Sequence, residues 1–318
     1  MWRKVSLSPL FWLMCIFLNR QEEKAMTQFL QQLVNGLSLG SIYALIALGY
    51  TMVYGIIKLI NFAHGDIYML GAFVAFYATR YFQLNFFLAL IIAMVFCGVL
   101  GVLIERIAYK PLRHATRITA LITAMGVSYI LEYGTQFFAG SDVKTFPEGL
   151  LGNLNLEFWG IRISAQQILI FTITIVLMLA LTYIVNRTKM GRAMRAVSVD
   201  EKAAQLMGIS VDRTISFTFL LGSLLAGAAG VLVGVYYNSI NPLMGMTPGL
   251  KAFIAAVFGG IGVIPGAMIG GLSIGIAETL VIAYGSSLYK DAIVYVILIL
   301  ILIIKPAGLL GKNVKEKV

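Results

Sequence analysis

Apolar runs long enough to cross a bilayer recur along this 318-residue chain. The clearest occupies residues 168–185, ILIFTITIVLMLALTYIV, and contains no charged residue. A bilayer-spanning helix needs about 20 mostly apolar residues, so a chain with many such runs must bury them in lipid or against one another. The segments predicted to span are 33–57, 62–80, 86–104, 118–139, 166–186, 214–236, 250–264, 266–284 and 289–304, of which 62–80 and 250–264 are the weakest.

The proportion of charged residues supports this interpretation. They make up 12% of the chain, against about 25% in soluble domains. The sequence therefore predicts an all-α polytopic membrane protein. Basic loops explain the net charge of +10 better than nucleic-acid binding does.

Loop charge sets the predicted orientation. Lysine and arginine are concentrated in loops 105–117 and 187–213 and after residue 304, and such an excess is typical of cytoplasmic segments. The C-terminus is then cytoplasmic, and the longer loop 140–165, with mixed charge, is external. The total is eight spans if 33–57 and 62–80 form one interrupted span, and nine if they are separate.

The first 25 residues differ from the rest of the chain. They combine a basic start, a short apolar core and a polar exit, as signal or anchor segments do, but without a clear small-residue cleavage site. An equally good interpretation places the true start at Met26. In both cases residues 1–25 are an N-terminal extension, and residues 26–318 form a single transmembrane domain.

Motifs for covalent or metal chemistry are missing from the sequence. It contains no phosphate-binding loop, GxSxG, HExxH or paired-cysteine metal motif. His64 and His114 are too few for a histidine metal site in one chain, and Cys15 and Cys97 do not indicate a disulfide framework. We therefore expect no catalytic residue, no metal and no cofactor, and any ATP must bind to another polypeptide.

A short helix is predicted inside the second basic loop. Ser198 and Glu201 have capping-box spacing, and Gly208 is placed to end the helix. The apolar residues that fall on one face are Val199, Ala203, Leu206 and Met207. A helix of about nine residues is marginal alone in water, so this face must dock. Two surfaces stay open: the membrane, helped by Arg192 and Arg195, or a groove on a cytoplasmic partner.

Two segments interrupt apolar runs with polar or helix-breaking residues. LINFAHGDIYMLGAF carries Asn61, His64 and Asp66 within six positions, and Gly65 among them would permit a bend. The second segment, 249–278, is rich in glycine. Broken helices are tolerated in lipid only against protein or a water-filled path. Transporters built from inverted repeats have them in corresponding positions, but close packing of small residues gives the same pattern.

Two acidic residues lie within predicted spans. Glu278 follows the apolar run GAMIGGLSIGIA, and Glu132 lies in VSYILEYGTQF. A charge at the bilayer centre costs roughly 2.5–3.5 kcal/mol, so both must face protein or water. A structural hydrogen bond between helices is the favoured interpretation for Glu132, and narrowly for Glu278.

Together these stretches resemble the LivH-type permease subunits of ATP-driven (ABC) importers for branched-chain amino acids. The resemblance extends from about residue 26 to the C-terminus. It rests on separated motifs in the order of that family: NGLSLGSIYALIALGYTMVYGIIKLINFAHGDIYMLGAF (35–73), MGRAMRAVSVDEKAAQLMGI (190–209), NPLMGMTPGLKAFIAAVFGGIGVIPGAMIGGLSIGIAE (241–278) and KPAGLLG (305–311).

The resemblance implies a division of labour. A periplasmic binding protein delivers leucine, isoleucine or valine, a second related permease completes the pore in the bacterial inner membrane, and two cytoplasmic ATPases supply the energy. It implies a pore-lining role around residues 61–66 and 259–266, with Asn61, His64, Gly65, Asp66, Gly259, Gly260 and Gly262 as the candidate pathway positions. Glu278, the acidic residue within a predicted span, is a further candidate. It implies ATPase-coupling positions at Gly191, Arg192, Arg195, Ser198, Glu201, Ala203, Leu206 and Gly208.

Other functions remain open at this stage. A permease of the same family could carry another amino acid, urea or a short amide. An ion-coupled secondary transporter would use Glu278 or the His64–Asp66 pair for protons and would need no ATPase. A channel or a membrane scaffold is a further alternative.

Overall fold

The computed structural model describes residues 9–59, 61–113, 115–147, 155–158 and 160–311. The elements are α1 (Pro9–Ile57), α2 (His64–Arg80), α3 (Phe86–Ile104), a π-helical turn η1 (Glu105–Tyr109), η2 (Lys110–Leu112), α4 (Arg117–Ala139), β1 (Asn155–Phe158), β2 (Ile161–Ser164), α5 (Ala165–Arg187), α6 (Lys189–Val199), α7 (Glu201–Leu206), α8 (Val211–Tyr237), α9 (Met246–Gly259), α10 (Ile264–Tyr284), η3 (Ser287–Tyr289) and α11 (Lys290–Ile304). Outside the described residues lie His114, the first eight residues of the N-terminal extension, part of loop 140–165 (148–154 and 159), and the C-terminal Lys312, Lys315 and Lys317.

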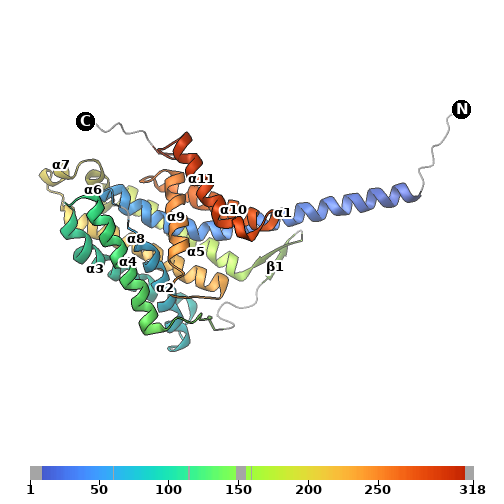
Figure 1. Cartoon of the computed structure of the whole chain (residues 1–318), viewed down its shortest axis with the longest axis horizontal. Coiled ribbons are helices and arrows are strands. Elements are labelled where there is room, and N and C mark those ends of the chain that lie inside the picture. Colours follow the sequence, from blue (N-terminus) through green and yellow to red (C-terminus); the bar gives the residue numbers. More distant parts are fainter. Residues whose placement is uncertain (1–8, 60, 114, 148–154, 159, 312–318) are drawn as a thin grey trace.

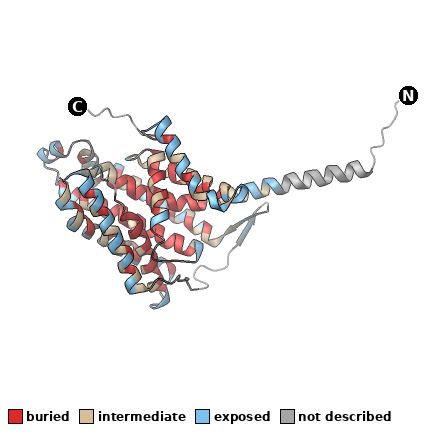
Figure 2. Ribbon diagram, viewed as in Figure 1, coloured by how far each residue is buried: buried red, intermediate tan, exposed pale blue. Residues whose placement is uncertain are grey.

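The helices form one bundle with α8 near its centre (Figure 1). α8 packs against α1, α2 and α3, and α1 packs along α10. The most apolar window of α8 is 89% buried, whereas that of residues 287–304, which include α11, is 11% buried. Buried residues therefore concentrate around α8 and the second half of α1 (Figure 2), while outer helices such as α3 and α11 turn large apolar side chains outward.

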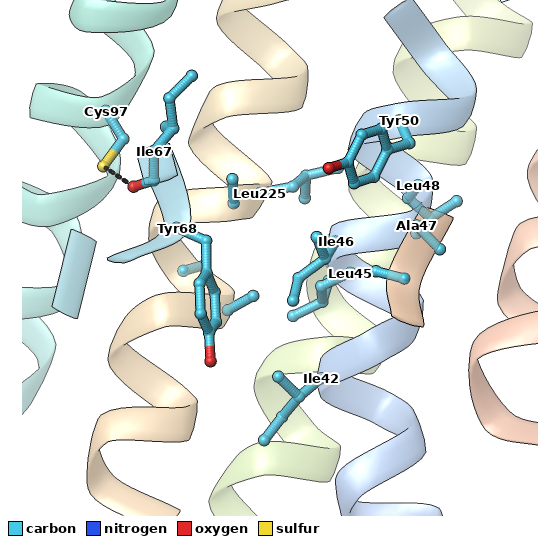
Figure 3. Packing of buried hydrophobic residues seen from close by; sticks show 14 of the residues in the cluster. Ile42, Leu45, Ile46, Ala47, Leu48, Tyr50, Ile67, Tyr68, Cys97 and Leu225 are labelled. Atoms are coloured by element: carbon cyan, nitrogen blue, oxygen red, sulfur yellow. Dashed lines mark hydrogen bonds between the residues drawn. The ribbon is translucent and has the colours of Figure 1, made fainter. Parts of the chain in front are cut away.

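Close approach of backbones holds the centre together. Ile67 and Tyr68 of α2 lie against α8, and the segment 42–50 of α1 lies on another side of it (Figure 3). A Cβ on Gly71 would lie 2.7 Å from the backbone of Gly227, so α2 and α8 touch there. In lipid the hydrophobic effect does not drive helices together, so close van der Waals packing of this kind supplies much of the stabilisation.

The predicted all-α polytopic fold is confirmed. Within the described residues, six helices are long and apolar enough to cross a membrane: Ala25–Ile57, Phe86–Leu112, Ala165–Arg187, Val211–Tyr237, Ile264–Tyr284 and Ser287–Ile304. α2, α4 and α9 complete the bundle. The chain reverses direction between α1 and α2. The C-terminal half of α2 reaches the C-terminal end of α8, where the ring centroid of Phe76 lies 6.0 Å from that of Phe146 and the Phe146 amide donates to Asn238. Segments 33–57 and 62–80 are therefore separate helices.

The predicted span 250–264 has the wrong limits. α9 ends at Gly259, and a turn containing Gly260 (φ 108°) and Gly262 (φ 89°) separates it from α10. These left-handed φ values favour glycine, which has no Cβ to clash. The same order of helix, break and helix occurs at α1–α2, while an inverted repeat remains a prediction.

Different loops occupy the two ends of the bundle. Loop 140–165 contains a small antiparallel hairpin, β1–β2, that the sequence did not predict. Gln31 of α1 holds this hairpin by exchanging hydrogen bonds with the backbone of Arg162. Loop 187–213, with α6 and α7, lies at the opposite end (Figure 1). α1 begins at Pro9, inside the segment predicted to be an N-terminal extension, and its first part projects away from the bundle (Figure 1).

Candidate functional site

The break between α1 and α2 lies inside the bundle. Asn61 is buried and accepts a hydrogen bond from the Tyr109 hydroxyl at 2.8 Å, and the His64 amide donates to the Asn61 carbonyl at 3.1 Å. His64 lies beside Gly49, which is about 12 Å along α1 from Ile57 at 1.5 Å per residue. The chain therefore returns into the bundle before α2 begins.

His64 packs against α1 and not against Asp66. Its ring centroid lies 4.7 Å from that of Tyr50, edge-on, and its imidazole fills the space that Gly49 leaves by lacking a Cβ. Side chains two positions apart on a helix do not face each other, and Asp66 points to α4 instead. Among the described residues, the His64–Asp66 pair shares no hydrogen bond.

Gly65 allows close packing rather than a bend. It lies in the first turn of α2, and among the described residues of the break the left-handed backbone is at Lys58 (φ 55°). A Cβ on Gly65 would lie 2.5 Å from the carbonyl oxygen of Gly245 and 3.3 Å from Cα of Gly249. The expectation of a bend at Gly65 is wrong, because this glycine brings the first turns of α2 and α9 into backbone contact.

Asp66 faces a cavity of about 230 Å³ between α1, α2, α4 and α9. Its carboxylate is buried and accepts a hydrogen bond from the Ser128 hydroxyl on α4. At ~30 Å³ per water molecule, the space corresponds to roughly eight waters, which is the size of one small organic molecule. Apolar and aromatic side chains form most of the wall, among them Phe62, Leu121, Met125, Tyr129 and Leu250.

Glu132 lines the same cavity, one helical turn beyond Ser128 on α4. It is 8% exposed, and it has no hydrogen bond or ion pair within the part of the chain that the structure describes. The interhelical hydrogen bond favoured for it from sequence is therefore not formed. We call this space, with Asp66 and Glu132 on its wall, the acidic cavity.

The second break, at Gly259, Gly260 and Gly262, lies apart from the acidic cavity. The C-terminal segment closes it, because the amides of Leu309 and Leu310 donate to carbonyls at the end of α9 at 2.8 and 3.0 Å. Gly262 packs against the last turn of α1. The two sets of pathway residues predicted around the breaks are thus not brought into one site.

Glu278 belongs to a separate buried network. Lys251 on α9 donates to its Oε1 at 2.6 Å, and the Tyr43 hydroxyl donates to its Oε2 at 2.9 Å. Lys251 also pairs with Asp291 of α11 at 2.6 Å. The network joins α1, α9, α10 and α11, as expected from the interpretation of Glu278 as an interhelical hydrogen-bonding group.

α6 lies against both breaks. Gly191 fits under the carbonyls of the last turn of α5, where a Cβ would overlap Val185, and Arg195 donates to the Val185 carbonyl. Met194 and Arg195 line a small space of about 80 Å³ together with the end of α1 and Gly262. A displacement of α6 would therefore reach the end of α1 and the turn between α9 and α10.

α7 begins later than the sequence predicted. Its N-cap is Asp200, whose side chain accepts a hydrogen bond from the Ala203 amide at 2.9 Å. Ser198 lies inside α6, so the predicted capping box of Ser198 and Glu201 is wrong. The physical reason is that α6 continues past Ser198 and Asp200 then caps the next helix. Gly208 has φ 81° just beyond α7, as its predicted role as a stop requires.

The residues of the predicted apolar face are exposed but do not share one helix, because Val199 ends α6, Ala203 and Leu206 lie in α7, and Met207 follows α7. Val199, Leu206 and Met207 are 87%, 88% and 82% exposed, and Ala203 is exposed beside them. Nothing in the described residues covers them. Arg192 and Glu201 are also exposed.

Sequence reasoning missed Ser128 and Lys251. Ser128 has a weak signal, because it precedes Glu132 by four positions and so lies on the same helical face. Lys251 has a stronger one, because it is a lone cation in an apolar segment and therefore needs an acidic partner such as Glu278.

Comparison with known proteins identifies the family. The family model described as "Branched-chain amino acid transport system / permease component" matches residues 32–302. The high-affinity branched-chain amino acid transport system permease protein LivH of Escherichia coli K12 is 46% identical over 305 residues, covering 91% of this chain and 98% of LivH. BraD of Pseudomonas aeruginosa, which carries the same description, is 45% identical with the same coverage. LivM of Escherichia coli K12, also a permease protein of that system, is 26% identical over 249 residues, covering 71% of this chain and 58% of LivM. This chain belongs to the permease family of branched-chain amino acid transport systems.

Proposed function

We propose that this chain is the permease subunit of an ATP-driven importer of leucine, isoleucine and valine in the bacterial inner membrane. The observation that carries the proposal is 45–46% identity, over nearly the full length, to permeases named for high-affinity branched-chain amino acid transport. The acidic cavity supports it, because its apolar wall suits an aliphatic side chain. The subunit itself does not hydrolyse ATP.

The proposed transporter contains several other subunits. A second, related permease forms the pore with this one, which agrees with the similarity between this chain and LivM. A periplasmic binding protein delivers the substrate at the end that carries β1 and β2. Two ATPases bind the opposite end, where α6, α7 and the C-terminus then lie in the cytoplasm.

α6 and α7 form the proposed coupling element. The exposed apolar side chains of Val199, Leu206 and Met207 are suited to a hydrophobic groove on an ATPase. α6 in turn contacts the end of α1 and the turn at Gly262. A movement of the ATPases would therefore shift the helix ends next to both breaks and change access to the path through the bundle.

Reconstituted uptake tests the proposed substrate and energy source. The permease, its partner permease, the two ATPases and the binding protein are placed in proteoliposomes, and uptake of labelled leucine, isoleucine and valine is measured with and without ATP. We expect ATP-dependent uptake of all three. Uptake of urea or an amide in their place would assign another substrate, and uptake driven by a proton gradient without the ATPases would support an ion-coupled carrier.

Variants of α7 test the coupling element. Ala203→Asp with Leu206→Asp places charge on the exposed apolar face and should abolish both ATPase capture and uptake. Gln205→Asp is the matched control, since it adds one charge to an exposed position of the same helix outside the apolar face. If the double variant still assembles and transports, this coupling surface is refuted.

A further inference from the structure

The buried carboxylates of the bundle fall into two classes. Among the described residues four are buried, and Glu105 and Glu278 each form an ion pair with a basic side chain. Asp66 and Glu132 have no cationic partner within the described residues, although both are more than nine-tenths buried. Both line the acidic cavity.

Two contacts offset part of the cost of burying a negative charge on Asp66. It lies in the first turn of α2, where the helix dipole stabilises a negative charge, and Ser128 donates to it. Glu132 has neither support. Two carboxylates in a space of low polarity repel each other, and a cation between them would relieve the repulsion. Both carboxylates would therefore stabilise a positively charged group bound in the cavity.

The rest of the cavity wall selects the other parts of a ligand. Leu121, Met125 and Leu250 offer an apolar surface next to the carboxylates. The first turn of α9 contributes Met246, and its N-cap, Gly245, also lines the cavity and has no side chain that could cap the helix. Backbone amides at such a helix start bind carboxylates. The cavity thus offers two carboxylates to a cationic group, an apolar surface to an aliphatic group, and a helix start to a carboxylate.

We propose that the acidic cavity is a binding station for the amino acid during its passage, with the α-ammonium group held by Asp66 and Glu132. The aliphatic side chain packs on Leu121 and Met125. This inference rests on the proposed function. It assigns recognition of the ammonium group to the permease itself, so a neutral amide, which has no cation, gains nothing from the two carboxylates.

Proteoliposomes with the complete transporter test this assignment. Glu132→Gln and Asp66→Asn should each lower leucine uptake at least tenfold. Complex assembly, and the ATP hydrolysis stimulated by the loaded binding protein, should be retained. Tyr133→Phe is the matched control, because it changes an outward-facing residue next to Glu132 on α4, and it should transport like the wild type. Glu132→Asp, which keeps the charge, should recover part of the uptake lost in Glu132→Gln.

A charge reversal sharpens the test. Glu132→Lys puts an ammonium group beside Asp66, so the variant should assemble and yet take up no leucine. Wild-type uptake by Glu132→Gln or by Glu132→Lys would overturn the binding station but not the proposed function. Loss of assembly in Glu132→Gln would also overturn it, because Glu132 would then have a structural role. A wild-type transporter that takes up none of the three amino acids would overturn the proposed function, and the binding station with it.

Discussion

The acidic cavity and the Lys251–Glu278 network put buried carboxylates within the same bundle, and α9 contributes to both. In the network, the ammonium of Lys251 and the hydroxyl of Tyr43 satisfy Glu278, and helices close around the group. In the acidic cavity, Asp66 and Glu132 have no cation among the described residues, and about 230 Å³ of space remains open. Burial of a charge alone therefore does not distinguish a structural carboxylate from a functional one. The two differ in whether the protein itself supplies the counter-charge.

Removal of the counter-charge from the network should have the largest effect. Lys251→Met leaves Glu278 buried without a cation, and breaking a buried pair on one side costs about 3–5 kcal/mol. Thermal unfolding in detergent should show a large drop in stability. The double variant Lys251→Met with Glu278→Met should recover most of the loss, because a well-packed apolar pair replaces both charges. A single variant as stable as the wild type would show that this pair is not structural.

Widening the contact between α2 and α9 should have the next largest effect. Gly65→Ala pushes a methyl group into the Gly245 carbonyl, and overpacking of this kind typically costs about 1–3 kcal/mol. Because that contact forms one edge of the acidic cavity, leucine uptake should fall together with the unfolding temperature. Gly134→Ala is the control, since a Cβ there meets nothing within 4 Å. Equal unfolding temperatures for the two variants would contradict the role assigned to Gly65.

Local pattern was sufficient for the helices and for some of the candidate site. Hydropathy located the apolar helices, spacing picked out apolar residues of the loop that are in fact exposed, and the apolar context of Glu278 indicated an interhelical bond. The pattern failed where distant segments decide the outcome. The role of Gly65 depends on Gly245, far away in the chain, and the partner of Glu132 could not be judged without knowing what faces α4. The cap at Asp200 was missed because α6, which occupies Ser198 and Val199, was not predicted from the sequence.

Loss of the hydrogen bond to Asp66 should have a smaller effect. Ser128→Ala removes the hydroxyl that donates to this carboxylate. A hydrogen bond to a charged group contributes about 1.5–3 kcal/mol when nothing replaces it. Water can enter the adjoining cavity, so we expect a loss near the lower end, about 1.5 kcal/mol, in chemical denaturation. Ser38→Ala is the control, because Ser38 donates only to the carbonyl of Val34 in its own helix. A larger loss of unfolding free energy in Ser38→Ala than in Ser128→Ala would contradict a stabilising role for the Ser128–Asp66 hydrogen bond.

Neutralising Glu132 should have the smallest effect on stability, and it separates the two regions most sharply. Glu132→Gln keeps the shape of the side chain, removes its repulsion with Asp66 and breaks no hydrogen bond or ion pair in the described part of the chain. The unfolding temperature should stay the same or rise, with a change in the free energy of unfolding of no more than about 1 kcal/mol, because removing a like charge relieves strain in a medium of low polarity. Glu278→Gln is the comparison, since it makes the same substitution in a paired site and should lower the unfolding temperature. Equal destabilisation by the two variants would mean that Glu132 holds the bundle together as Glu278 does, and the space beside it would then need no ligand to explain its charge.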